Sequence, residues 1–326
     1  MMKKQLPKKL LLAHLGLLAA TIIWAGAGPV IKLTLDFLPP FAFIVFRFAI
    51  VCTIFLPYVF FTLRSHPIDW KDLPNIFWLG VFGQASIVFI FIGLKYTTAI
   101  DAAIMNLLSP IAIILAGHYF YNEKINNVQK TGYAIATLGT LLIAIEPALT
   151  PSNTTVPTHL RIFGNFMVVI YQLAWPAYII LGKRMMGEQS SIVNKAFKYF
   201  HLHQMHKKYN STLLTILTFY VGLAVLTPFA LWESFALVNP QPIVLTFPSI
   251  LGLLYMALIS SIVAYLLFDW SLPKVEAADT ALYNYMSPLF SIPIAMVFLG
   301  EVLTSTVTIG MAVIGLGVLI AEKYKS

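Results

Sequence analysis

Two stretches of the chain place asparagine, serine, proline and glutamate at identical spacing inside apolar sequence. The first, NLLSPIAIILAGHYFYNE, covers residues 106–123, and the second, NYMSPLFSIPIAMVFLGE, covers residues 284–301, 178 positions later. Asparagine side chains both donate and accept hydrogen bonds, so Asn106 and Asn284 could bind polar groups of a small molecule. We therefore treat both as candidate substrate-binding residues.

The prolines of these stretches, Pro110 and Pro288, should kink the helices that contain them. A proline removes one helix hydrogen bond and clashes with the carbonyl four residues earlier, here that of Asn106 or Asn284. Freed polar backbone at membrane depth is tolerated only against protein or a water-filled cavity. We expect both asparagines to face a central path; the alternative is a kink packed against neighbouring helices.

Asp269 is an ionisable residue in the apolar run AYLLFDWSLPK, and Phe91 takes its place in the first half of the chain. A charged group at this depth predicts a function, because burying it in lipid is unfavourable. Asp269 could carry a proton or pair with a cationic substrate; alternatively it reaches the interface or pairs with Lys274. For Arg47, in another apolar run, we expect a structural role.

Aromatic and amide side chains supply further candidates for the lining of a cavity. Aromatic rings can enclose an apolar or cationic substrate, although tryptophan is also common at membrane interfaces. With the two asparagines, the candidate substrate-binding residues are Trp24, Gln84, Asn106, Tyr171, Trp175, Tyr265 and Asn284.

Sequence signatures of catalysis and nucleotide binding are missing from the chain. It holds no G-x-x-x-x-G-K-[ST], H-E-x-x-H or G-x-S-x-G motif, so we expect neither direct use of ATP nor an enzyme. His201, His203 and His206 could mimic a metal cluster, but structural zinc takes four ligands and no cysteine is near. We expect no metal and no cofactor.

The composition requires lipid as the solvent for much of this chain. Of its 326 residues 59% are apolar and 10% are charged, with a mean hydropathy of +0.83, whereas soluble domains have about 25% charged residues. The net charge of +8 lies between apolar runs rather than on one basic face, which argues against nucleic acid as a partner. Membrane lipid and a small molecule are the expected partners; the oligomeric state stays open.

The apolar runs predict an all-α integral membrane protein with ten transmembrane helices. Each run is long enough for a hydrocarbon core of about 30 Å, which takes roughly 17–25 residues. The predicted spans are 10–32, 39–62, 74–95, 99–121, 128–146, 161–181, 211–233, 247–270, 277–299 and 304–321.

The distribution of Lys and Arg orients these spans. With a cytoplasmic N-terminus, seventeen of the 21 Lys and Arg residues fall in internal segments, against three at external ends (Lys32, Lys95 and Arg161). Cytoplasmic segments carry this excess of positive charge. We therefore expect both termini in the cytoplasm, in a cell membrane of the bacterial inner-membrane kind.

The two halves of the chain repeat one another. Residues 1–147 hold five predicted spans and residues 161–326 hold five more, joined by an external linker, 148–160; the long internal loop is 184–210. Because five is odd, the second half starts from the opposite side of the membrane. Such inverted repeats serve alternating access in secondary transporters. We expect Glu123 and Glu301, at the ends of spans four and nine, to cap the helices that follow.

The sequence resembles the EamA type of drug/metabolite transporters over nearly its whole length. IIWAGAGPVIKLTLDFLPPFAFIVFRFAI resembles the first-span signature of that family, and AADTALYNYMSPLFSIPIAMVFLGEVLT, with the glycine-rich last helix, resembles its closing signature. The chain departs from the pattern in the 184–210 loop, in Asp269, and in YNE where Gly-Glu is common. The resemblance implies a ten-helix bundle whose cavity is formed by spans one, three, four, six, eight and nine.

The resemblance also implies transport of small metabolites, often amino acids or related compounds, and frequently outward. The leading hypothesis is a secondary carrier that exports such metabolites, with proton coupling through Asp269. The alternatives are an importer or exporter of hydrophobic or cationic compounds and, from another class, a structural membrane scaffold. A scaffold would not require polar kinks mirrored in both halves.

Overall fold

The computed structural model describes residues 8–121, 125–149, 156–185, 202–203, 205–207, 209–236, 240–271, 274 and 277–323, and all regular structure in these ranges is helical. The first half contains α1 (Lys8–Leu35), α2 (Pro40–Ser65), η1 (Trp70–Asp72), α3 (Leu73–Gly80), η2 (Val81–Ala85), α4 (Ile87–Tyr96), α5 (Ala99–Met105), α6 (Leu108–Tyr121), α7 (Asn127–Ala144) and α8 (Glu146–Leu149). The second half contains α9 (Thr158–Met185), α11 (Ser211–Phe235), α12 (Phe247–Leu254), η3 (Tyr255–Val263), α13 (Ala264–Ser271), α14 (Ala277–Leu299) and α15 (Ser305–Lys323).

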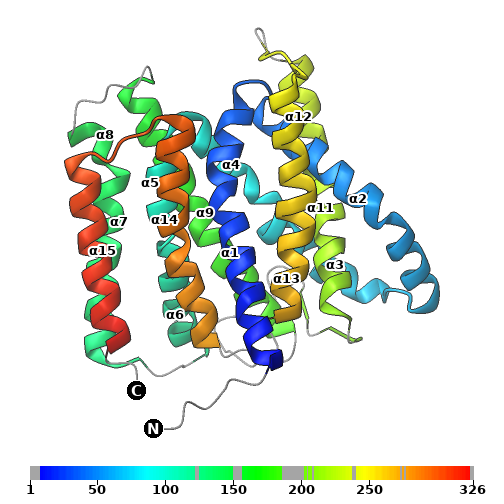
Figure 1. The fold of residues 1–326 in the computed structure, drawn as a ribbon. Coiled ribbons are helices and arrows are strands. Elements are labelled where there is room, and N and C mark those ends of the chain that lie inside the picture. The colour runs from blue at the N-terminus through cyan, green and yellow to red at the C-terminus, as the bar shows by residue number, and fades with distance from the viewer. Residues whose placement is uncertain are drawn as a thin grey trace.

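The helices form one bundle in which α1 and α9 lie near the middle (Figure 1). Helices α7 and α15 pack together along one edge, and α2 packs against α11 on the opposite side. Helix α1 contacts α13 and α14, while α9 contacts α4 and α6. Helix α1 begins and α15 ends at the same end of the bundle (Figure 1).

Six helical stretches in the described residues are long and apolar enough to cross a membrane: Lys9–Leu35, Pro40–Ser65, Trp70–Tyr96, Ala99–Phe120, Thr212–Phe235 and Phe247–Phe268. Shorter apolar helices cover Tyr285–Leu299 and Ser305–Ala321. The expectation of a multi-pass, all-helical membrane protein is confirmed at this level. Helices also lie over the remaining predicted spans, but the count of ten membrane crossings stays a prediction.

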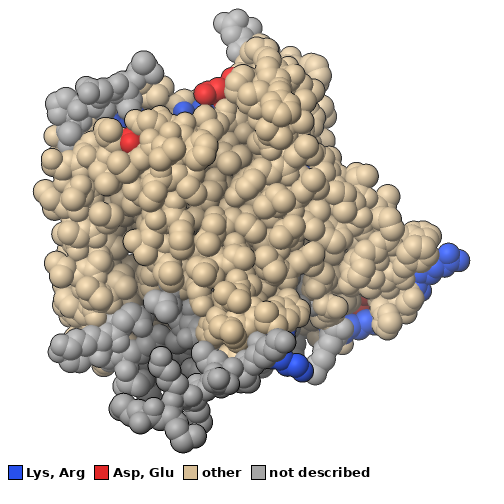
Figure 2. Space-filling model, viewed as in Figure 1, with Lys and Arg blue, Asp and Glu red and all other residues tan. Residues whose placement is uncertain are grey.

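Figure 2 shows a broad uncharged band across the visible face, with the coloured charged side chains at the two ends of the bundle. Many large apolar side chains are exposed, among them Leu289 and Val297 on α14, which are 68% and 78% exposed. An apolar surface of this extent is unfavourable in water but suits lipid.

Glycines bring α7 and α15 into backbone contact. A Cβ added to Gly132 would lie 2.6 Å from the carbonyl oxygen of Gly317, and one added to Gly139 would lie 2.9 Å from that of Gly310. Position 132 therefore meets 317 while 139 meets 310, so the two helices run antiparallel. Small residues at such seams allow close packing where lipid offers little hydrophobic driving force between helices.

The predicted fourth span is interrupted at Asn106–Leu107, between α5 and α6. The Asn106 carbonyl, which we expected Pro110 to leave free, accepts a hydrogen bond from the Ser109 N–H at 3.2 Å. Pro110 is the third residue of α6, where a helix N–H has no intrahelical partner in any case. In the equivalent stretch α14 continues through Pro288. The assignment of kinks to these two prolines remains a prediction.

Spans three and eight both contain π-helical segments, η2 at Val81–Ala85 and η3 at Tyr255–Val263. The 178-residue offset of the repeat places 81–85 on 259–263, inside η3. Neither segment contains proline, and the sequence analysis did not predict them. π-Helical turns leave backbone groups without their usual partners and recur at functional sites. The residues around η2 and η3 are therefore candidates for the functional site.

Carboxylates cap helices across the bundle. Glu301 accepts hydrogen bonds from the N–H groups of Ala99 and Ile100 at 2.8 and 2.9 Å. It therefore caps α5 in the other half of the chain, and our expectation that it caps the next helix was wrong. The chain leaves α14 through Gly300, whose φ of 64° is a left-handed conformation that glycine adopts without strain. Glu123 lies outside the described residues.

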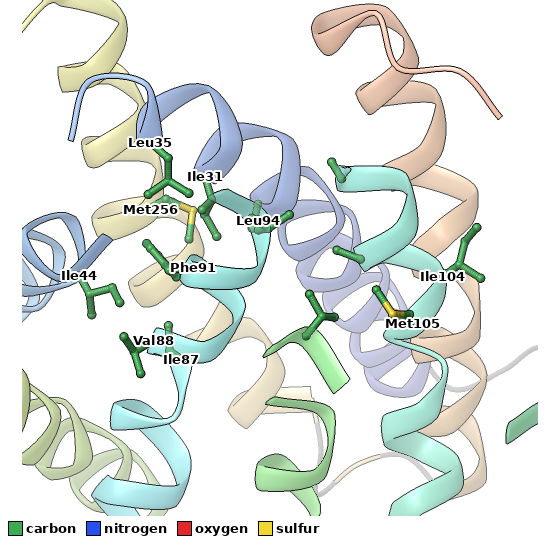
Figure 3. Packing of buried hydrophobic residues seen from close by; sticks show 14 of the residues in the cluster. Ile31, Leu35, Ile44, Ile87, Val88, Phe91, Leu94, Ile104, Met105 and Met256 are labelled. Atoms are coloured by element: carbon green, nitrogen blue, oxygen red, sulfur yellow. The ribbon is translucent and has the colours of Figure 1, made fainter. Parts of the chain in front are cut away.

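Buried apolar side chains from several helices fill the space between them (Figure 3). Ile31, Phe91 and Met256 come from α1, α4 and η3, and each is less than 5% exposed. This packing fixes the relative positions of the central helices, which carry the polar residues described next.

Candidate substrate site

Trp24 joins α1 to the π-helical segment of span eight. Its indole Nε1 donates to the backbone carbonyl of Ser260 at 3.1 Å, so the side chain satisfies an acceptor within η3. The rings of Trp24 and Tyr265 meet edge to face with centroids 5.3 Å apart. The structure thus brings together two predicted site residues that are 241 positions apart in the sequence.

Arg47 on α2 reaches the same segment. Its Nε donates to the hydroxyl of Ser261 at 2.7 Å, and the guanidinium lies 5.7 Å from the centre of the Phe48 ring. Arg47 is only 4% exposed. Arg47 is therefore a buried cation next to η3, whereas from the sequence we expected this residue to have only a structural role.

Gln84 lies in η2, the π-helical segment of span three, and is 2% exposed. No group in the described ranges donates a hydrogen bond to its Oε1. A Cβ on Gly222 of α11 would lie 2.9 Å from Gln84 Cβ and 2.8 Å from Phe48 Cε2. The Gln84 side chain is therefore close to the Phe48 ring, which also lies beside the Arg47 guanidinium.

Asn106 connects the break in span four to α9. Its Oδ1 accepts a hydrogen bond from Nε2 of Gln172, a buried residue that follows Tyr171 directly. Trp175, one turn further along α9, packs against Tyr178 with ring centroids 5.1 Å apart. Asn106, Tyr171 and Trp175 are all half-buried. Helix α9 packs against spans three and four, and Gln172 joins it to the break in span four.

Two predicted residues cannot be placed as side chains. Asn284 lies on α14 and Asp269 on α13, but their side chains are outside the described part of the structure. The neighbouring Lys274 places Nζ 3.7 Å from the centre of the Trp270 ring. The roles predicted for Asn284 and Asp269 stay predictions.

A buried ionic cluster joins α5, α8 and α9 at the end of the bundle that we predicted to be external. The Arg161 guanidinium lies 3.0 Å from carboxylates of both Asp101 and Glu146, and all three residues are almost fully buried. Asn165 accepts a hydrogen bond from Thr97 and donates to the carbonyl of Ile143. The sequence offered no signal for these long-range pairs, apart from the unusual placement of charge next to apolar runs.

Asp72 anchors the second half of the chain at the opposite end. Its carboxylate accepts hydrogen bonds from the His206 N–H at 3.0 Å and the Tyr209 hydroxyl at 2.7 Å. Burial raises the pKa of Tyr209 to about 12, so its hydroxyl stays protonated and can donate.

Ring nitrogens of His203 and His206 lie 3.4 and 3.2 Å from Asp72 Oδ1. The three potential ligand atoms lie within 4.8 Å of one another, so this is where the described residues could hold a metal. Structural zinc takes four ligands, however, and Asp72 already accepts bonds from the chain. We interpret the cluster as a tether; His201 lies outside the described residues.

A groove of about 780 Å³ opens at the surface between α1, α13 and the start of α11, lined by Leu12, Leu15, Gly16, Ala19, Thr212, Leu266, Leu267 and Trp270. None of the predicted site residues lines it. Its walls are apolar, and Leu12 and Leu15 are about half exposed. We favour the central polar residues over this groove as the substrate site, because a lipid tail suffices to explain an apolar groove on a membrane-facing surface.

Several known proteins are similar in sequence to this chain over most of its length. An uncharacterized transporter of Archaeoglobus fulgidus is 27% identical over 291 residues, covering 88% of this chain and 89% of its own. A probable amino-acid metabolite efflux pump of Salmonella typhimurium is 24% identical over 313 residues, covering 94% of this chain and 92% of its own.

One solved crystal structure shares the fold, with a TM-score of 0.58 at 17% identity, covering 96% of this chain and 99% of the other. The sequence profile of the EamA-like transporter family matches residues 11–145 and again residues 162–322. The chain therefore belongs to the EamA-like transporter family, as its sequence signatures predicted.

Proposed function

We propose that this protein is a secondary carrier that exports amino acids or related small metabolites across the cell membrane by alternating access. The observation that carries the proposal is the set of buried polar groups on α1, α2, η2, α9 and η3, inside a member of a transporter family. Polar side chains at this depth rarely persist without a function. Two relatives are named probable amino-acid metabolite efflux pumps, which supports the substrate class.

Alternating access rests on two inverted halves, and three observations support this part of the proposal. The family profile matches once in each half. The π-helical segments fall at equivalent positions of spans three and eight.

The third observation is the contact between α7 and α15. In the repeat, Gly132 corresponds to Gly310 and Gly139 to Gly317. The pairs in contact are 132 with 317 and 139 with 310. A twofold relation maps each of these contacts onto the other, as in a self-complementary interface. We therefore propose that the two halves of the chain are residues 1–147 and 161–326.

The described conformation fits a carrier that is closed toward one side. The Arg161 cluster, with Asp101 and Glu146, joins α5, α8 and α9 at the end we assign to the outside. Opening that end would require these buried ion pairs to separate. We propose that both termini are cytoplasmic, so that the other end admits substrate from inside the cell.

The test is transport by the purified protein in proteoliposomes. We expect loaded amino acids to leave the vesicles faster than from protein-free vesicles, without ATP. Conversion of the compound to a product would indicate an enzyme, and the absence of flux for every amino acid tested would remove the proposed substrate class. Reversing the gradient separates exporter from importer, because it reveals any preferred direction.

A further inference from the structure

Two of the central polar residues, Arg47 and Gln84, have complementary unused hydrogen-bonding groups. Arg47 carries N–H donors on three nitrogens, but only Nε has a hydrogen-bond partner in the part of the chain that is described. Gln84 presents a buried carbonyl oxygen, Oε1, that receives no donor from the described residues. One group lacks an acceptor and the other lacks a donor.

The Arg47 guanidinium also lacks a carboxylate partner among the described side chains. The ion pairs found there join Arg161 to Asp101 and Glu146, and histidines to Asp72. An arginine stays ionised in proteins, and a buried charge without a partner is strongly unfavourable. A guanidinium that is 4% exposed and bonded only to the Ser261 hydroxyl is therefore suited to an anion that arrives from outside the chain.

The geometry points to Arg47 as the residue that binds the anionic group of the transported compound, with Gln84 accepting from its ammonium group. This inference rests on the proposed transport function and names the recognition chemistry of the same site. A carboxylate matches the planar fork of a guanidinium, which can donate two parallel hydrogen bonds. The compound recognised is thus a zwitterion, such as an amino acid, and a cationic amine without a carboxylate is disfavoured.

A series of aromatic rings begins at Phe48, the ring beside the Arg47 guanidinium. Phe48 stacks edge to face on Phe219, with centroids 5.3 Å apart, and Phe219 packs in the same way on Tyr265 at 5.6 Å. Trp24 extends the series beyond Tyr265. Such walls suit an apolar or aromatic side chain on the substrate.

The experiment measures efflux of three related probes from proteoliposomes containing the full-length protein. L-Phenylalanine carries both charged groups, 3-phenylpropionate carries only the carboxylate, and phenethylamine carries only the ammonium group. We expect the wild-type protein to move L-phenylalanine at least about tenfold faster than phenethylamine, since a charge-assisted pair contributes roughly 1.5–3 kcal/mol and each 1.4 kcal/mol is a factor of ten.

The variants separate the two contacts. Arg47→Gln should slow both carboxylate probes by about tenfold or more, whereas Gln84→Leu should slow L-phenylalanine but not 3-phenylpropionate. Arg64→Gln is the matched control, because Arg64 lies on the same helix and is exposed. Its flux should equal that of the wild type.

The outcomes distinguish this inference from the function on which it rests. Equal wild-type flux of phenethylamine and L-phenylalanine, or unchanged carboxylate flux in a folded Arg47→Gln variant, overturns the role of Arg47 while transport stands. No wild-type flux of any of the three probes overturns this inference, whereas the proposed transport function is overturned only if no amino acid in the first experiment is moved. If gel filtration shows that Arg47→Gln does not fold, the selectivity of the wild-type protein among the three probes decides the matter alone.

Discussion

The α7–α15 seam offers a direct test of the packing between the two halves, through alanine at Gly317. A Cβ at this position would lie 2.5 Å from both the backbone nitrogen of Ala136 and the carbonyl oxygen of Gly132. Both atoms belong to the backbone, so no side-chain rotation can relieve the overlap. The helices would have to separate by roughly 1 Å, which forfeits a quarter to a half of the dispersion energy at each contact.

Gly315 on the same helix provides the control, because a Cβ there would meet nothing within 4 Å. Both substitutions gain the same helix propensity, about 1 kcal/mol for alanine over glycine. The difference between the variants therefore isolates the cost of overpacking, about 1–3 kcal/mol. Gly315→Ala should be as stable as the wild type or slightly more stable, and Gly317→Ala should be the less stable of the two.

The assay is thermal unfolding of the purified proteins in the same detergent. With a shift of roughly 2–4 °C for each kcal/mol in proteins of somewhat smaller size, the melting temperature of Gly317→Ala should fall several degrees below that of Gly315→Ala. Equal melting temperatures would refute the close backbone contact, and with it the reciprocal glycine pairs on which the twofold relation rests.

The remaining predictions concern charge and polarity. Arg161→Met leaves two buried carboxylates without their partner and should lower the free energy of unfolding by about 3–5 kcal/mol; a chemical-denaturation curve that matches the wild type would contradict this. Asn106→Ala and Asn284→Ala should each impair efflux while membrane insertion is unchanged, and normal flux in both would remove the asparagines from the site. Asp269→Asn should flatten the pH dependence of efflux, and an unchanged pH profile would exclude proton coupling through that carboxylate.

The membrane helices could be predicted from the sequence because lipid imposes a simple requirement. A helix that crosses the hydrocarbon core needs a continuous apolar run, and the run 10–32 indeed lies within α1, Lys8–Leu35. The break in span four was harder to locate. Proline chemistry pointed to position 110, whereas the helix is interrupted at Asn106–Leu107, where the side chain of Asn106 bonds to Gln172.

The composition of the site could be predicted only in part, because its contacts join residues far apart in the chain. Trp24 and Tyr265 were recognised as candidates by residue type, and they do meet. We expected a structural role for Arg47 because nothing in its own helix indicates that its side chain donates a hydrogen bond to Ser261, which is 214 residues away. The π-helical segments, including the one that holds Gln84, leave no signal such as proline in the sequence.

Alternating access of the central site is the claim that most needs a direct measurement, and the chain is well suited to it because Cys52 is its only cysteine. In a Cys52→Ala background, a cysteine introduced at Asn106 can be modified by a membrane-impermeant maleimide from either face of oriented membranes. The account predicts modification from both faces, with a ratio that shifts when a transported amino acid is added. Modification from one face only, whatever compound is present, would contradict it.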